Sequence, residues 1–186
     1  NCNFYKIMDE HLSKEELFQV LHEKMIEHGY DNQKLNNIYN FCKSIYGDRK
    51  RYSGDDYVTH LLNVSLLLVQ MEAEESVIYA GMFCDVFRKT NIAIDELKEN
   101  LPDSVVQILI RLKDYDIEKV GLEDEQCAVL KIAERLHNMR TIEYMEECER
   151  QKRAKETIAI FMPVVKKLQD DKLISELNEI SINCLK

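Results

Sequence analysis

The segment from residue 57 to residue 71 constrains the fold of this chain most strongly. If it is helical, its apolar side chains do not keep to one stripe. They recur around the helix, at Val58, Leu61, Leu62, Val64, Leu66, Leu67, Leu68 and Val69. A helix that is apolar all round belongs in the interior, because no face of it suits water. The sequence therefore predicts that this helix lies at the centre of a globular core.

Few residues in the chain would interrupt helices. The 186 residues include five Gly, two Pro and no Trp, and the hydrophobic fraction of 45% is ordinary for a globular protein. This composition favours an all-α fold. The length fits a single domain over residues 1–186. Because the chain begins with Asn1 rather than Met, we expect it to be a fragment of a longer protein or to lack a disordered start.

The remaining helices are predicted from capping residues and apolar spacing. Ser13 and Glu16 have the spacing of a capping box, and apolar residues continue at helical spacing to Met25. Further helices are expected at 35–45, 74–88, 94–99, 102–113, 123–138, 148–167 and 171–184, with a loop at 47–56. Pro102 suits a first helical turn, and Pro163 should end or kink the helix that contains it.

The net charge and the cysteine spacing indicate which partners and which cellular compartment to expect. The net charge is −9 with acidic residues spread along the chain, which argues against nucleic acid as a partner. No segment approaches the roughly 18 apolar residues of a membrane span, and no secretory signal is visible. The six cysteines are widely spaced without a CxxC pair, so free thiols and a cytoplasmic location are expected.

The most informative polar segment runs from residue 131 to 141. It is expected to be a helix that leads into a polar turn and carries Glu134, His137, Asn138 and Thr141. His137 and Asn138 could simply cap the helix end. His60 lies in the apolar segment, where a lone histidine is more often a hydrogen-bonded core residue than a ligand. His11, His22 and His28 show no partner pattern and carry no functional interpretation.

Several motifs together resemble the RelA/SpoT-type HD domain. Residues 131–141 are similar to the family signature K-[IL]-A-D-R-L-H-N-M-R-T, with Glu134 in place of its Asp. Residues 57–60 resemble Y-[IV]-x-H, residues 51–54 resemble R-K-S-G, and residues 152–163 resemble R-x-A-x-E-T-x-x-I-[YF]-x-P. The resemblance implies an HD-domain helical bundle. The family removes the 3′-pyrophosphate from the alarmones ppGpp and pppGpp.

The family's metal positions are only partly retained. Where the family reads L-H-D-V-[VI]-E-D-T, this chain reads Phe83-Cys84-Asp85-Val86-Phe87-Arg88-Lys89-Thr90. The resemblance places the ligand positions at His60, Cys84, Asp85 and Glu134. Cys84 could bind metal only as a thiolate, with a preference for softer ions such as Zn²⁺ over Mn²⁺. We expect it instead to be a small buried thiol.

The family's catalytic Glu-Asp pair has become Arg88 and Lys89. This change removes the carboxylates that could accept a proton from an attacking water, and arginine cannot act as the base. Asp85 and Arg88 are three residues apart, so we expect them to pair on one helix, with Arg88 supplying the positive charge that Asp85 and Glu134 would otherwise get from a metal ion. The hypothesis is a salt-bridge cluster in a metal-free pocket.

The resemblance also assigns a nucleotide-binding set. Arg51 matches a basic residue that packs on the guanine base, Tyr52 replaces the usual Lys, and Ser53 completes that motif. Asn138 and Thr141 match positions that contact the nucleotide. The ligand would be ppGpp, pppGpp or another guanine nucleotide.

Three functions remain open from the sequence. The chain could be an inactive regulatory or nucleotide-binding module, an active (p)ppGpp hydrolase with an unusual metal set, or a purely structural interaction domain. We expect no cofactor, or Mn²⁺ if the family activity is retained. A synthetase domain could be fused outside this segment.

Overall fold

The computed structural model describes residues 12–186, all of whose regular elements are helical. The α-helices are α1 (Lys14–Glu27), α2 (Leu35–Tyr46), α3 (Tyr57–Gln70), α4 (Glu75–Gly81), α5 (Val86–Lys89), α6 (Ile94–Asn100), α7 (Asp103–Asp114), α8 (Ile117–Val120), α9 (Glu125–Arg140), α10 (Glu147–Glu156), α11 (Met162–Lys167) and α12 (Asp171–Cys184). Shorter turns are the 3₁₀ segments η1 (Gly121–Asp124) and η2 (Ile142–Tyr144) and the π segment η3 (Thr157–Phe161). The all-α prediction is confirmed.

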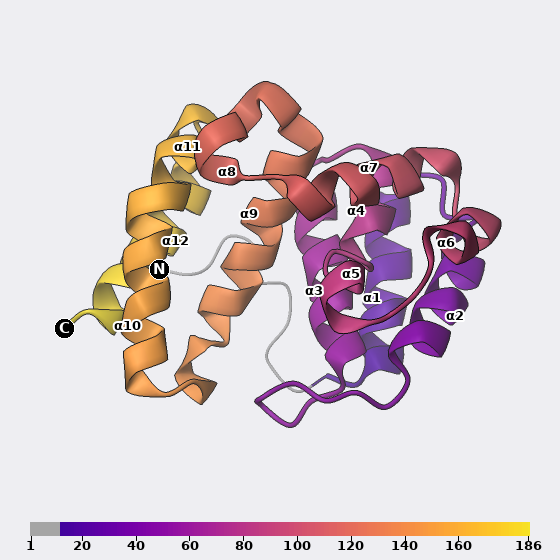
Figure 1. Ribbon diagram of the computed structural model, residues 1–186, viewed down its shortest axis with the longest axis horizontal. Helices are drawn as coiled ribbons and strands as arrows, with labels where there is room; N and C mark the ends of the chain where they lie inside the picture. Colours follow the sequence, from indigo (N-terminus) through magenta and orange to yellow (C-terminus); the bar gives the residue numbers. More distant parts are fainter. Residues whose placement is uncertain (1–11) are drawn as a thin grey trace.

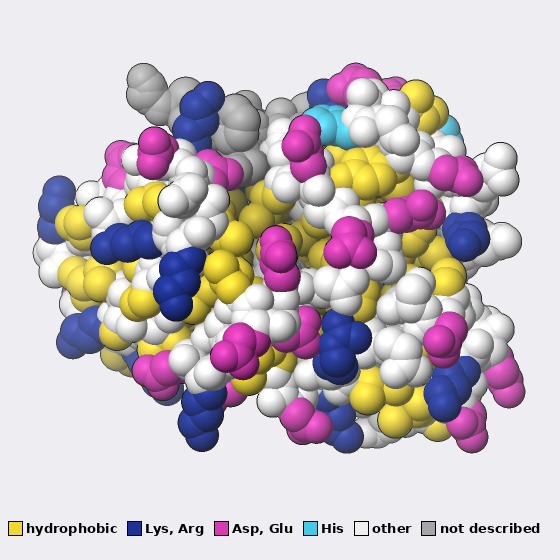
Figure 2. Space-filling model, turned by 90° about the horizontal axis from the view of Figure 1, so that it is seen from above, with side chains coloured by type: hydrophobic (Ala, Val, Ile, Leu, Met, Phe, Trp, Pro, Cys, Tyr) yellow, Lys and Arg dark blue, Asp and Glu magenta, His cyan; other side chains and the backbone are white. Residues whose placement is uncertain are grey.

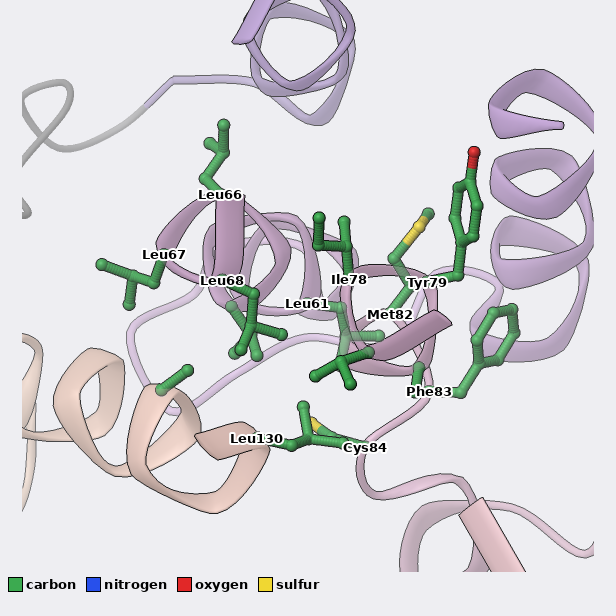
Figure 3. Close-up of a cluster of buried hydrophobic side chains, with 14 of the residues drawn as sticks. Leu61, Leu66, Leu67, Leu68, Ile78, Tyr79, Met82, Phe83, Cys84 and Leu130 are labelled. Atoms are coloured by element: carbon green, nitrogen blue, oxygen red, sulfur yellow. The ribbon is translucent and has the colours of Figure 1, made fainter. Parts of the chain in front are cut away.

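The apolar helix α3 is the centre of the core, as predicted. It packs against α1, α4 and α9, and Figure 1 shows it between the helices of the N-terminal half and α9. The side chains of Leu61, Leu62 and Leu68 are fully buried. Figure 3 shows leucines of α3 facing α4 and Leu130 of α9. Burial of one such side chain contributes about 1.5–3 kcal/mol, so α3 is the main source of hydrophobic stabilisation.

The prediction of one continuous helix over residues 74–88 is wrong. The chain is helical in α4 and again in α5, but residues 82–85 form turns between them. At the end of α4, a Cβ on Gly81 would lie only 2.8 Å from Leu68 Cδ1. Glycine therefore lets α4 approach α3 closely. The turn that follows places Cys84 and Asp85 beside α3 and α9 rather than along a straight helix.

The helix predicted at 148–167 is interrupted in the way Pro163 suggested. A π turn at η3 separates α10 from α11, and Pro163 occupies the first turn of α11. Proline has no N–H to donate to the preceding turn, and a local π geometry accommodates that missing bond. The C-terminal helices α10 to α12 pack together and lie on the other side of α9 from α3 (Figure 1).

Other boundaries agree closely with expectation. The Ser13 hydroxyl accepts from Glu16 N–H at 3.1 Å, and the Glu16 carboxylate accepts from Ser13 N–H at 3.1 Å, which completes the capping box. Pro102 lies one position earlier than predicted, at the N-cap of α7. In the described part of the chain, no helix has both the length and the apolar character that a membrane span requires.

The cysteines of the described residues are all free thiols: Cys42, Cys84, Cys127, Cys148 and Cys184. Cys2 and His11 lie outside the described residues.

Candidate functional site

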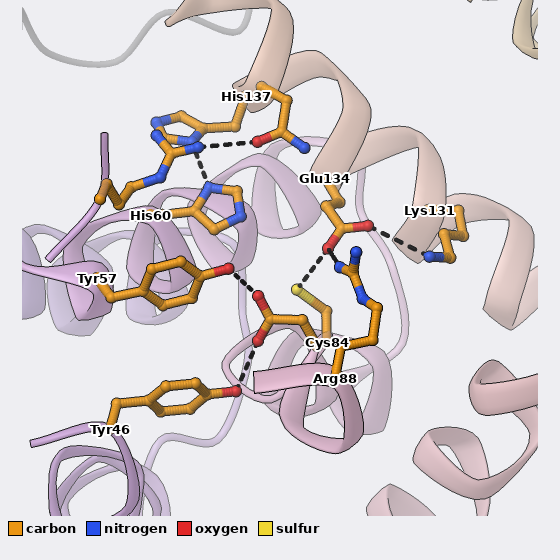
Figure 4. A network of polar contacts seen from close by, with 11 residues as sticks. Tyr46, Tyr57, His60, Cys84, Arg88, Lys131, Glu134 and His137 are labelled. Atoms are coloured by element: carbon orange, nitrogen blue, oxygen red, sulfur yellow. Dashed lines mark hydrogen bonds and ion pairs between the residues drawn. The ribbon is translucent and has the colours of Figure 1, made fainter. Parts of the chain in front are cut away.

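Four buried side chains converge where the sequence placed the family's metal positions. His60 comes from α3, Cys84 and Asp85 from the turn before α5, and Glu134 from α9. One potential ligand atom from each lies within 4.8 Å of those from the others, and all four residues are buried. Figure 4 shows His60, Cys84 and Glu134 facing one another. The arrangement depends on the break between α4 and α5, which aims residues 84 and 85 inward.

Two tyrosine hydroxyls hold the Asp85 carboxylate. Tyr46 donates to Asp85 Oδ1 at 2.7 Å, and Tyr57 donates to Asp85 Oδ2. Burial raises the pKa of Asp85, although these two hydrogen bonds oppose the shift. Burial and the Asp85 charge in turn raise the pKa values of Tyr46 and Tyr57, so both hydroxyls remain donors.

The Glu134 carboxylate has three donors of its own. Its Oε2 accepts from Arg88 NH2 and from Cys84 Sγ, each at 3.3 Å, and its Oε1 lies 3.4 Å from Lys131 Nζ. The prediction that Arg88 pairs with Asp85 is therefore wrong, because Arg88 bonds Glu134 instead. Asp85 occupies the N-cap position of α5 without a side-chain capping bond, because its carboxylate accepts from the two tyrosines, while Arg88 reaches across to α9.

Charge and burial set the protonation of the cluster. Burial, followed by the Glu134 charge, raises the pKa of Cys84 well above its usual value, so this group is a thiol. Burial lowers the pKa of Arg88, but the charges of Glu134 and Asp85 outweigh it and raise the pKa overall. The guanidinium of Arg88 is thus electrostatically coupled to both acids, although it bonds only Glu134.

His60 contacts a second buried histidine that the sequence assigned to a helix cap. His60 Nδ1 lies 2.6 Å from His137 Nδ1, so one of the two rings donates to the other. Burial lowers the pKa of His137 to about 3 and lowers the pKa of His60 well below its usual value. Both rings are neutral near pH 7. If His60 is the donor, its Nε2 lone pair is left for the cluster.

The predicted nucleotide-binding residues form a neighbouring cluster. Arg51 NH2 donates to Asn138 Oδ1 at 2.9 Å, and Arg51 NH1 donates to Thr141 Oγ1 at 3.2 Å. Tyr52 lies beside them, with the Arg51 guanidinium 4.7 Å from its ring centroid. Ser53 does not join this cluster, since its hydroxyl donates to Asp55 at 3.0 Å.

Cations surround the mouth of the buried cluster. We call Arg51, Arg88, Lys89 and Lys131 the basic rim. After burial and His137, the charges of Arg51, Arg88 and Lys89 contribute to the lowered pKa of His60, so all three act on the same buried ring. Lys89 Nζ also lies 5.7 Å from the Tyr57 ring centroid. Residues 88 and 89 therefore bring positive charge where the family has acids.

The donor set fits a hard cation poorly. Mn²⁺ prefers oxygen and imidazole ligands, whereas one of the four donors here is a thiol, and two cations already accompany Glu134. Imidazole, thiolate and carboxylate donors are those that Zn²⁺ accepts. The residues present thus do not match the metal that the family resemblance implies.

A second part of the surface is a hollow lined by acidic rather than basic side chains. It has a volume of about 250 Å³ and lies among the α3–α4 turn, the start of α9 and the α11–α12 turn. Its lining combines an apolar floor with acidic residues, which are Glu72, Glu74, Glu125 and Asp170. Figure 2 shows hydrophobic side chains surrounded by acidic ones on the face seen from above. An anionic nucleotide suits the basic rim and not this hollow.

Comparisons with known proteins agree with this architecture. The family model described as HD domain matches residues 39–119. A solved structure titled "A metazoan ortholog of SpoT hydrolyzes ppGpp and plays a role in starvation responses" superposes with a TM-score of 0.62. It is 17% identical, and the match covers 81% of this chain and 95% of that one. The chain therefore contains an HD domain.

Three curated proteins show which kind of HD domain this chain resembles in sequence. The chain is 31% identical over 164 residues to the GTP pyrophosphokinase rsh of Brucella ovis, covering 79% of this chain and 22% of that protein. It is 28% identical to the guanosine-3′,5′-bis(diphosphate) 3′-pyrophosphohydrolase of Aquifex aeolicus, covering 84% and 25%. It is 26% identical to the GTP pyrophosphokinase of Streptomyces coelicolor, covering 82% and 20%.

This HD domain is of the RelA/SpoT type, with altered residues at the family's metal and catalytic positions. The chain spans about a fifth to a quarter of the length of these curated relatives.

Sequence reasoning gave no site role to four members of the site, which are Tyr46, Tyr57, Lys131 and His137. Lys131 lies three residues before Glu134 and His137 three residues after it, so helical spacing could have placed both beside the carboxylate. Tyr46 had no such signal, because its approach to Asp85 depends on how α2 packs.

Proposed function

We propose that this HD domain binds a guanine nucleotide of the ppGpp type without hydrolysing it and acts as a regulatory module. The observation that carries the proposal is the contact between Arg88 and Glu134. A cation stands at the mouth of the site where the family has its catalytic carboxylates, and it is bonded to a remaining acid.

The basic rim supports binding of phosphate groups. Arg88 and Lys89 are exposed, so both can reach an anion without leaving the protein surface. Arginine meets phosphate oxygens through paired N–H groups and lysine through a point charge. A pyrophosphate could thus be held by side chains alone, in the absence of a metal.

The Arg51 cluster supports recognition of the base. A planar guanidinium held by Asn138 and Thr141 presents a flat cationic face, and Tyr52 adds an aromatic ring beside it. Purine bases stack on both kinds of surface. Tyr52 is partly exposed at 45%, so a base can reach the ring.

The absence of hydrolysis follows from the chemistry of residues 88 and 89. An attacking water must lose a proton to a positioned base, and neither arginine nor a protonated lysine provides one. Asp85 and Glu134 are the nearest carboxylates, and both are already hydrogen-bonded by protein donors.

The alternative is an active hydrolase with a non-standard metal set. The observation in its favour is that four candidate ligand atoms, from His60, Cys84, Asp85 and Glu134, lie within 4.8 Å of one another. When bound, a divalent ion would supply an activated water and neutralise phosphate charge. A third candidate is an interaction domain with no ligand.

The deciding experiment compares ppGpp binding and ppGpp turnover in one preparation. Calorimetry in EDTA should show binding, and incubation with Mn²⁺ or Zn²⁺ should release no pyrophosphate. Arg51→Ala should weaken binding about tenfold or more, because charge-assisted hydrogen bonds contribute about 1.5–3 kcal/mol. Arg49→Ala, an exposed arginine in the same loop, is the matched control and should leave affinity unchanged.

Each contrary outcome identifies another function. Bound metal together with pyrophosphate release would establish the hydrolase. No binding and no turnover would leave the interaction domain.

The proposal extends to the cellular location of the protein and to the domains that flank this segment. We infer a single cytoplasmic domain that takes part in the stringent response and has other domains, such as a synthetase, outside this segment. The support is that curated relatives named GTP pyrophosphokinase are four to five times longer than the matched region.

A further inference from the structure

The charges of the buried cluster are balanced by protein groups. Two acids, Asp85 and Glu134, lie beside neutral His60 and the Cys84 thiol. Arg88 and Lys131 approach the two oxygens of Glu134, and tyrosine hydroxyls approach the two oxygens of Asp85. Two buried carboxylates normally need a compensating cation, and here the guanidinium provides one.

The Arg88 side chain contacts the buried cluster while remaining largely exposed to solvent. Its side chain is 64% exposed, and only one guanidinium nitrogen reaches the buried Glu134. It therefore lies on the solvent side of the cluster, in contact with Glu134 alone among the four donors. Removing it would take away one positive charge and one donor from Glu134, while leaving His60, Cys84 and Asp85 in their present positions.

We propose that Arg88 is a resident counter-cation, and that the four donors beneath it form a latent site for a thiophilic divalent cation such as Zn²⁺. The site is closed while Arg88 is bonded to Glu134 and disfavours Mn²⁺ whether Arg88 is present or not. On binding, Cys84 would give its thiol proton to solvent and ligate as thiolate. This inference does not depend on nucleotide binding. It rests on the donor set alone.

The selectivity follows from the donors. A His, Cys and two carboxylates are a set that Zn²⁺ accepts in tetrahedral geometry, and thiolate favours Zn²⁺ over Mn²⁺. The guanidinium opposes any of these ions by direct repulsion and by competing for Glu134. Coulomb repulsion between a unit positive charge and a divalent ion a few ångströms away lowers metal affinity by about tenfold or more at the effective dielectric constant of a protein surface.

The test is Zn²⁺ affinity measured by competition with a chromophoric chelator in nucleotide-free protein. Arg88→Ala should bind one Zn²⁺ at least about tenfold more tightly than the unaltered chain. Arg88→Gln is a second variant that keeps a polar side chain, and it should show the same gain. Lys89→Ala removes a neighbouring cation for which no bond to Glu134 is found among the described residues, and its gain in Zn²⁺ affinity should be clearly smaller than that of Arg88→Ala.

A second readout identifies the ligand. Co²⁺ bound by Arg88→Ala should give a thiolate-to-metal charge-transfer band, and the double variant Arg88→Ala, Cys84→Ser should lose both the band and the gain in Zn²⁺ affinity. Mn²⁺ should bind weakly to every variant. Circular dichroism confirms that each variant is folded before its affinity is compared.

Three results would overturn the proposal. These are equal Zn²⁺ affinity with and without Arg88, no Zn²⁺ binding by folded Arg88→Ala and Arg88→Gln, and binding that survives the loss of Cys84. None of these results bears on ppGpp binding in EDTA, so failure here is distinguishable from failure of the proposed function.

Discussion

Two of the arginine–glutamate pairs that involve helix α9 differ in geometry and in exposure to solvent. At one end, Arg140 of α9 donates to Glu176 of α12 through Nε at 2.6 Å and through NH2 at 2.8 Å. In the middle, Glu134 of α9 accepts one bond from Arg88 of α5 at 3.3 Å. The side chains of the first pair are 14% and 4% exposed, whereas the Arg88 side chain is 64% exposed.

The difference separates a structural contact from an adaptable one. Two short parallel bonds fix the angle between α9 and α12, and the loss of either partner would leave a buried charge. A single long bond to an exposed guanidinium stabilises the fold little, because solvent competes for it. The Arg88 pair is therefore free to exchange its partner for a ligand, while the Arg140 pair is not.

The largest expected effect comes from breaking the buried pair. Arg140→Met should lower the free energy of unfolding by about 3–5 kcal/mol, since Glu176 would keep its charge without its partner. Urea denaturation followed by circular dichroism measures this loss. Arg153→Met breaks an exposed pair with Glu149, whose atoms lie 3.9 Å apart, and should change stability by less than about 1 kcal/mol. Equal losses in the two variants would contradict the distinction.

Acid provides a second test, because it acts on the buried contact between His60 and His137 beside the Arg88 cluster. The folded pKa of His137 is about 3, below its ordinary value of 6.5, so only the unfolded chain takes up this proton between those values. Stability is thus full above pH 6.5 and falls as pH decreases toward 3. Between pH 7 and pH 5 the loss should be about 2 kcal/mol from His137, and His60 acts in the same direction.

The measurement is urea denaturation at both pH values, with His137→Gln as the variant. Its pH dependence should be shallower than that of the unaltered chain. A slope that is unchanged in His137→Gln would show that another group is responsible.

Among the variants of the compared pairs, the smaller effect on stability is expected for the pair of Arg88 with Glu134. Arg88→Ala should lower the free energy of unfolding by only about 1 kcal/mol at pH 7 without added metal, because Lys131 still accompanies Glu134 when the exposed guanidinium is lost. The same denaturation experiment serves as the measurement. A loss comparable to that of Arg140→Met would mean that Arg88 is a structural residue.

The core was predictable because its signal is local. The apolar residues of segment 57–71 require burial wherever the segment lies, and Ser13 with Glu16 marks a helix start by spacing alone. The break after Gly81 was not predictable in the same way. The residues at 82–88 suit a helix, and the turn there arises from close packing of α4 on α3, which no local pattern records.

The site was predictable in its membership and not in its pairing. Motifs placed His60, Cys84, Asp85 and Glu134 together, and the structure brings them together. The partner of Arg88 depended on the direction of α5, which follows from the same unpredicted turn. Asp85 lies at the N-cap of α5 and not within the helix. The rule that residues three apart on a helix face each other therefore does not apply to Asp85 and Arg88.

The bonds of Arg51 to Asn138 and Thr141 also bear on the order of folding. They join positions 87 and 90 residues apart, so a long stretch of chain must be closed before either bond can form. The loop at 47–56 gains this tether only after α9 has docked, which places its ordering late in folding. Opening of the end of α9 should release the loop as well, so hydrogen exchange should report the two segments as one cooperative unit.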